Sequence, residues 1–171
     1  MSIDTPARIE PDFHGPEKQQ LAAWLDYHRA TLLIKCAGLT FQQLATASVP
    51  PSTLTLLGLL RHMTFVEEYW FQRVFAGDDV ISIYESRDDP DADLNDLQSA
   101  PLEDVERHFL DVGDASREIV RTSDLDALAR SSGPSTTIDL RWVCVHLIEE
   151  YARHNGHADL LRERIDGATG D

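Results

Sequence analysis

The sequence has few of the features that direct a chain to a disulfide framework or to a nucleic acid. Its 171 residues include two cysteines, Cys36 and Cys144, which lie far apart and form no CxxC pair. Only 15 basic residues stand against 30 acidic ones, for a formal net charge of -15. This charge repels phosphate backbones and anionic lipids. We therefore expect no disulfide framework, no thiolate zinc site and no nucleic-acid partner.

Long apolar runs are also missing. The longest candidate, residues 54–60, is much shorter than the ~20 residues that span a bilayer, and Thr55 and Gly58 interrupt it. The first residues, MSIDTPARIEPDFHGPE, are polar and acidic, unlike the basic start and apolar centre of a signal peptide. These absences predict a cytoplasmic protein with no membrane partner.

What the sequence does contain is apolar material, 42% of its residues, arranged largely at helical spacing. Turn and capping residues divide this material into four long helices, with a further short helical piece at 124–130. The expected helices run from Pro16 to about Ala37, from Ser52 or Thr53 through Phe75 to a stop at Gly77, from Pro101 to about Thr122, and from Thr136 or Thr137, with Asp139, to Ile165. The pattern predicts an all-α protein, a four-helix bundle in a single domain over 16–167, after a flexible N-terminal segment at 1–15.

A strongly acidic stretch separates the second and third helices. Residues 78–96 contain one basic residue, Arg87, and the following acidic ones: Asp78, Asp79, Glu85, Asp88, Asp89, Asp91, Asp93 and Asp96. A calcium loop would require the ligand alternation, central glycine and closing glutamate of an EF-hand, which are missing. We interpret the stretch as a long, exposed crossover.

The last helix carries a cluster of potential metal ligands. At 100° per residue, Glu150, His154, His157 and His146 fall within an arc of about 80° that also carries apolar residues. A partly buried carboxylate beside imidazoles is costly unless a cation or hydrogen bonds compensate it, and a divalent metal can satisfy all of these groups. His62, at core spacing in the second helix, is the candidate third ligand beside Glu150 and His154.

Each of these residues also has an ordinary structural interpretation. Surface histidines are common on acidic helices, Glu150 can pair with Arg153 or Arg61, and a single histidine such as His62 is often a hydrogen-bonded core residue. Spacing alone leaves both interpretations open.

Three segments together resemble the DinB-like (YfiT-like) metalloprotein superfamily, in the branch found in mycothiol-using bacteria. They are WLDYHRATLL at 24–33, PPSTLTLLGLLRHM at 50–63 and EEYARHNGHADLLRE at 149–163. The last is similar to that superfamily's HxxxHRGQ segment, and His62 falls where the superfamily places its first ligand. Two departures are Glu150, where many members have histidine, and His157, which replaces a glutamine. The mycothiol-dependent maleylpyruvate isomerases likewise have one glutamate and two histidines.

The resemblance implies a divalent metal, zinc first and nickel as the alternative, held at one end of the bundle core by His62, Glu150 and His154. It implies a low-molecular-weight thiol, such as mycothiol, whose metal-bound thiolate attacks an electrophilic substrate in a transferase or isomerase reaction. His157 and His146 are candidates for orienting a ligand or moving a proton, and an exchange of ligand role between His157 and Glu150 stays open. His28 and Arg29 are weaker candidates for contacting the anionic thiol cofactor or substrate.

Three functions therefore remain open. The first is the thiol-using enzyme. The second is a non-catalytic metal-binding or stress-response bundle. The third is a structural helical bundle, which could form a homodimer. In this bundle the histidines and Glu150 form a hydrogen-bonded network.

Overall fold

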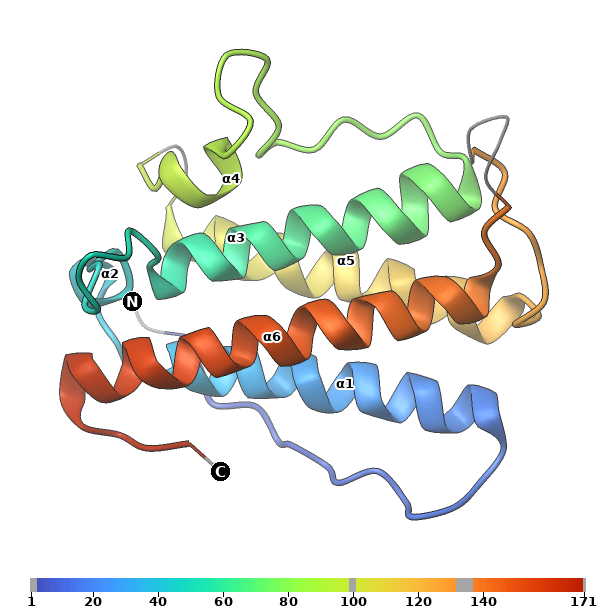
Figure 1. Ribbon diagram of the computed structural model, residues 1–171, viewed down its shortest axis with the longest axis horizontal. Helices are drawn as coiled ribbons and strands as arrows, with labels where there is room; N and C mark the ends of the chain where they lie inside the picture. The colour runs from blue at the N-terminus through green and yellow to red at the C-terminus, as the bar shows by residue number, and fades with distance from the viewer. Residues whose placement is uncertain (1–2, 99–100, 132–136, 171) are drawn as a thin grey trace.

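The computed structural model describes residues 3–98, 101–131 and 137–170, and its regular structure is helical. The long helical units are α1 (Glu17–Cys36), α3 (Leu56–Glu67) with its continuation η1 (Glu68–Ala76), α5 (Leu102–Thr122) and α6 (Leu140–Asp166). They lie side by side, with α3 and α5 running in one direction and α1 and α6 in the other (Figure 1). The all-α four-helix bundle is thus confirmed. In the described ranges, no helix has both the length and the apolar character needed to cross a membrane.

The core fills the space between these four units. α1 packs against α6, and α3 packs against both α5 and α6. The apolar stripes of all four units meet there, and their burial is the main force that holds the bundle together. Fully or almost fully buried members include Leu25, Leu32, Leu56, Leu59, Leu60, Met63, Phe71, Val105, Phe109, Val143, Leu147 and Leu161.

The second unit begins later than the sequence predicted. Its N-cap is Thr55, whose hydroxyl accepts a hydrogen bond from the Gly58 N–H at 2.9 Å, and not Ser52 or Thr53. The Ser52 hydroxyl instead accepts from the Leu54 N–H in the preceding turn. At its other end the helix widens into the π-helix η1. The helix stops at Gly77, as predicted, and Gly77 is in the left-handed conformation.

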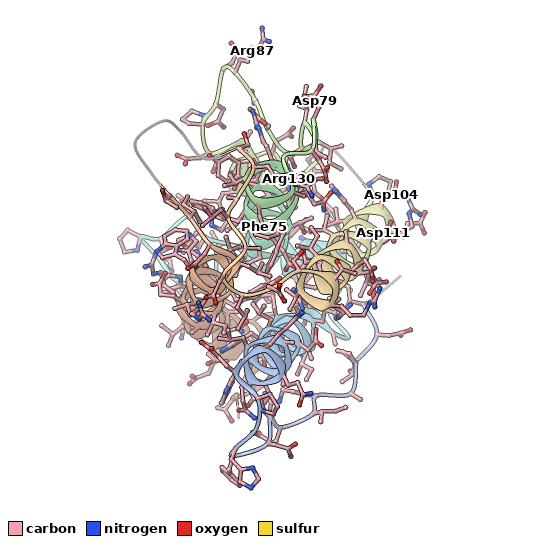
Figure 2. All side chains as sticks on the ribbon, turned by 90° about the vertical axis from the view of Figure 1, so that its right-hand side faces the viewer. Phe75, Asp79, Arg87, Asp104, Asp111 and Arg130 are labelled. Atoms are coloured by element: carbon pink, nitrogen blue, oxygen red, sulfur yellow. The ribbon has the colours of Figure 1, made fainter. Side chains whose placement is uncertain are left out.

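The acidic crossover leads from η1 back along the bundle to the start of α5, as Figure 1 shows. Its tip near Arg87 lies away from the four helices (Figure 2) and is exposed, as expected. The expectation of an exposed linker is wrong for other parts, because Tyr84, Ala92 and Asp93 are buried. Residues Ala92–Asn95 form a short helix, α4, which packs on α3.

The connection before α6 also differs from its prediction. Residues 124–130 form turns instead of a short helix, and Ala129 N–H donates to the Ile138 carbonyl at 2.8 Å. Arg130 N–H donates to the Phe75 carbonyl, which fastens this segment to the end of η1 (Figure 2). Asp139 is the N-cap of α6, and its side chain accepts from the Trp142 N–H at 2.8 Å. Thr137 is not the cap, and the alternative cap Thr136 lies outside the described residues.

The N-terminal segment runs beside α1 without regular structure (Figure 1). Its Ile3 side chain is 2% exposed, and the Ile3 carbonyl accepts from the Gly38 N–H at 3.1 Å just after α1. A short helix, α2 (Phe41–Leu44), follows and buries Leu44. The predicted flexibility of residues 1–15 stays a prediction, and residues 1–2 lie outside the described ranges.

Candidate metal centre

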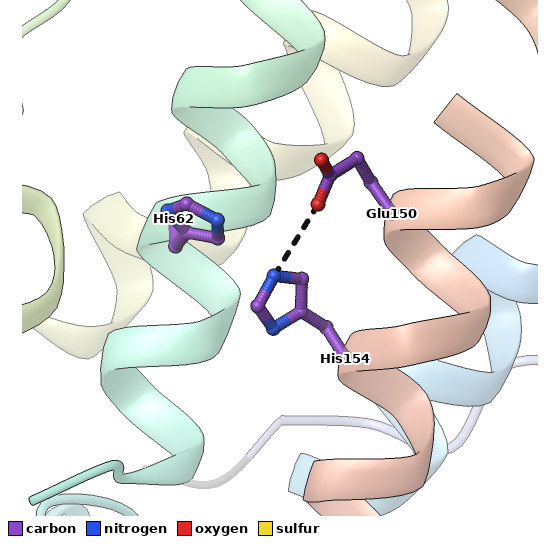
Figure 3. Close-up of side chains that lie close together, drawn as sticks. All are labelled: His62, Glu150 and His154. Carbon is purple, nitrogen blue, oxygen red and sulfur yellow. Dashed lines mark ion pairs between the residues drawn. The ribbon is translucent and has the colours of Figure 1, made fainter. Parts of the chain in front are cut away.

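Three predicted ligands converge in the space between α3 and α6. His62 comes from α3, and Glu150 and His154 come from successive turns of α6 (Figure 3). One donor atom from each residue lies within 4.8 Å of the other two. Nε2 of His154 is 3.5 Å from Oε2 of Glu150, and the rings of His62 and His154 are 4.7 Å apart between centroids. Folding therefore brings together residues that are far apart in the sequence.

Each of the two imidazoles is engaged at Nδ1 by a further side chain. Asp93 of α4 places Oδ2 at 2.6 Å from Nδ1 of His62. His157 places its Nδ1 at 3.4 Å from Nδ1 of His154, from the next turn of α6. The sequence predicts His157 as a candidate for such an orienting role, whereas Asp93 is not among the predicted site residues. Asp93 gave no signal in the sequence, because it is one of many acidic residues in the crossover.

The environment of His154 favours its neutral form. Burial, and then the neighbouring His62, His157 and Arg153, lower the pKa of His154 to about 4. At neutral pH its imidazole is therefore unprotonated and offers a nitrogen lone pair.

Two imidazoles and one carboxylate are a donor set that suits a zinc ion with one coordination position left for a further ligand. The side chains of His62, Glu150 and His154 are 21%, 16% and 12% exposed, so they are shielded yet reachable from solvent. The three residues thus fit a divalent metal. They lie about halfway along α6 rather than at one end of the bundle core.

A second group of possible ligands shares Glu150 with the first. It consists of His146, Glu149 and Glu150, again with donor atoms within 4.8 Å of one another. Arg153 forms an ion pair with Glu149, the carboxylate that belongs to this group alone, and also lies 3.7 Å from the shared Glu150. The first group is more buried and combines two helices. We therefore consider it the better candidate.

His146 extends the cluster along α6 toward two tryptophans. Its Nε2 lies 3.8 Å from Oε1 of Glu150. Its ring stacks on Trp142, with centroids 4.8 Å apart and planes at 14°, and also contacts Trp70 of η1. His146 is thus close enough to orient Glu150, and its own ring is held by aromatic packing.

The two predicted cofactor contacts lie elsewhere. His28 faces α6, where the Asn155 amide donates to its carbonyl at 3.1 Å and lies 3.3 Å from its Nδ1. Burial lowers the pKa of His28. The Arg29 side chain is buried against Glu67 and Asp26. Neither residue belongs to the group formed by His62, Glu150 and His154, so their contact with a thiol cofactor stays a prediction.

A cavity of about 510 Å³ lies between the N-terminal segment, α1 and α5. Arg29, Asp26, Tyr27, Phe109 and Arg117 are among its lining residues. It shares no residue with the candidate metal centre.

Two comparisons with known proteins give a match, one to a family and one to a solved structure. The model of a family described as mycothiol-S-transferase matches residues 20–167. No curated protein matches the chain. Among solved structures, a crystal structure of a conserved protein from Enterococcus faecalis is similar, with a TM-score of 0.64 and 13% sequence identity. The alignment covers 91% of this chain and all of the other, and at this identity it shows a shared fold.

Proposed function

We propose that this chain, which belongs to the mycothiol-S-transferase family, is a metal-dependent enzyme that transfers mycothiol or a similar low-molecular-weight thiol to an electrophile. The observation that carries the proposal is the convergence of His62, Glu150 and His154 within 4.8 Å. A divalent ion bound by such a group lowers the pKa of a coordinated thiol below its ordinary value of ~8.5 and so supplies a thiolate nucleophile at neutral pH.

The side chains around these ligands have separate tasks in this proposal. His154 binds without first losing a proton, because its pKa is about 4. His157 orients the His154 ring through the contact between their Nδ1 atoms. His146, near Glu150, holds that carboxylate or receives a proton released during the reaction. Zinc is the first expectation for the metal, with nickel as the alternative.

The proposal is tested by incubating zinc-loaded protein with mycothiol and a fluorogenic alkyl halide and measuring thioether formation by mass spectrometry. We expect thioether to form faster than in a protein-free control, and the gain to disappear in metal-free protein and in His154→Ala. Binding of zinc and thiol without any gain in rate would instead identify a non-catalytic binding protein. Failure to retain either zinc or nickel would overturn the proposal altogether.

A further inference from the structure

The acidic crossover directs one buried carboxylate at the candidate metal centre. The Asp93 side chain is 7% exposed, and its Oδ2 lies 2.6 Å from Nδ1 of His62. We infer that Asp93 is a positioning residue, which holds His62 in the tautomer with its proton on Nδ1 and leaves Nε2 for the metal. The inference rests on the metal-binding part of the proposed function.

The tautomer follows from the chemistry of the two groups. An ionised carboxylate only accepts hydrogen bonds, so His62 must donate through Nδ1. In a neutral imidazole with its proton on Nδ1, the lone pair is on Nε2. Figure 3 shows one ring nitrogen of His62 pointing toward Glu150 and His154, and because Asp93 engages Nδ1, that nitrogen is Nε2. Without Asp93, the tautomer and the ring orientation lose this constraint.

The helix that carries Asp93 is held firmly against α3. Arg61 is 1% exposed, and its guanidinium donates to the carbonyls of Ala92 and Asp93, each at 3.0 Å, and to that of Asp96. Arg61 directly precedes His62 in α3. Helix α3 therefore supplies the candidate ligand, His62, and also Arg61, which holds Asp93 in place beside that ligand.

Gly58, one turn before His62, permits this close packing. A methyl group added at Gly58 would lie 2.8 Å from the carbonyl oxygen of Leu94, which is too close for a carbon atom. The backbone of α4 can therefore approach α3 only because residue 58 has no side chain. Arg61 and Gly58 together account for the position of a carboxylate that would otherwise belong to an exposed acidic linker.

The first test reads the tautomer directly in metal-free, full-length protein. Long-range nitrogen–proton NMR correlations, with histidine labelled by ¹⁵N, distinguish a proton on Nδ1 from one on Nε2. We expect His62 to carry its proton on Nδ1 in the unmodified chain, and Asp93→Ala to shift His62 toward the Nε2 form. A matched control is Asp88→Ala, which removes an equal charge from an exposed position in the same crossover. It should leave the tautomer unchanged.

The second test measures zinc affinity by competition with a chelating dye. Removal of a group that orients a metal-ligating histidine typically costs 10- to 100-fold in affinity. We expect a loss of about that size in Asp93→Ala, a smaller loss in Asp93→Asn, which keeps an acceptor oxygen, and none in Asp88→Ala. Circular dichroism checks the fold of each variant, and if Asp93→Ala does not fold, Asp93→Asn decides.

Two outcomes separate this inference from the proposed function. Zinc binding within twofold of the unmodified chain in both Asp93 variants, together with an unchanged His62 tautomer, would overturn the role of Asp93 alone. If the unmodified chain bound neither zinc nor nickel, the proposed function would be overturned, and the orientation of His62 by Asp93 would then serve no metal.

Discussion

Arg29 of α1 and Glu67 of α3 form an ion pair inside the bundle, with 2.6 Å between Arg29 Nη2 and Glu67 Oε1. The Tyr151 hydroxyl of α6 donates to Glu67 Oε2 at 2.6 Å, so three helices meet at one carboxylate. Burial opposes the charge of Arg29, but the nearby Glu67 outweighs it and raises the pKa of Arg29 above its ordinary value. Arg29 thus has a structural role in the core, and its predicted contact with an anionic cofactor stays a prediction.

Removal of the Glu67 charge should destabilise the bundle. Arg29 is 3% exposed, and Glu67→Gln would leave its guanidinium without its main counter-charge. Breaking a buried pair in this way typically costs about 3–5 kcal/mol. We expect a loss of that order in the free energy of unfolding, measured in urea, and about 1–3 kcal/mol for Tyr151→Phe, which removes one hydrogen bond. A Glu67→Gln variant as stable as the unmodified chain would show that the pair contributes nothing.

Replacement of His154 should abolish metal retention without unfolding the protein. The bundle has its own apolar core, so His154→Ala should keep its helical circular dichroism while dialysed protein no longer holds zinc by plasma mass spectrometry. His14→Ala is a suitable control, because His14 is exposed and lies outside the bundle. Unchanged zinc content in His154→Ala would remove this residue from the site.

The choice between Glu150 and His157 as third ligand can be tested by zinc affinity. Glu150 shares a set of donor atoms with His62 and His154, whereas His157 contacts the far side of the His154 ring. Glu150→Gln should therefore weaken zinc binding by about 10-fold or more, a loss that even orienting residues produce. His157→Ala should have a smaller effect. The reverse order of losses would make His157 the ligand.

The low pKa of His154 predicts a dependence of stability on pH in the metal-free protein. Its pKa is about 4 in the folded state and near 6.5 in the unfolded chain. Between these values the unfolded state binds more protons, so this residue's contribution to stability falls as the pH decreases from about 6.5 to 4. Urea unfolding at pH 7 and pH 5 should show His154→Gln gaining stability relative to the unmodified chain at the lower pH. An equal difference at both pH values would contradict the lowered pKa.

The sequence alone determined the architecture and most of the candidate ligands. The apolar spacing of the four long helices reflects the burial of one face of each, which is a local property of the chain. Glu150 and His154 could be placed together because they lie one turn apart on a helix. The candidate ligands in the last helix could therefore be predicted from helical geometry alone. His62 was predicted from its core spacing and from the family resemblance.

Only the tertiary structure decided what the isolated polar residues contact. Asp93 could not be distinguished from its acidic neighbours, because its burial depends on the approach of α4 to α3 through Arg61 and Gly58. In the sequence, Arg29 cannot be distinguished from a surface arginine, because its partner Glu67 lies in another helix. Hydrogen bonds and ion pairs between distant segments leave no periodic pattern of residues in the sequence. They become visible only when packing has fixed which side chains share a buried space.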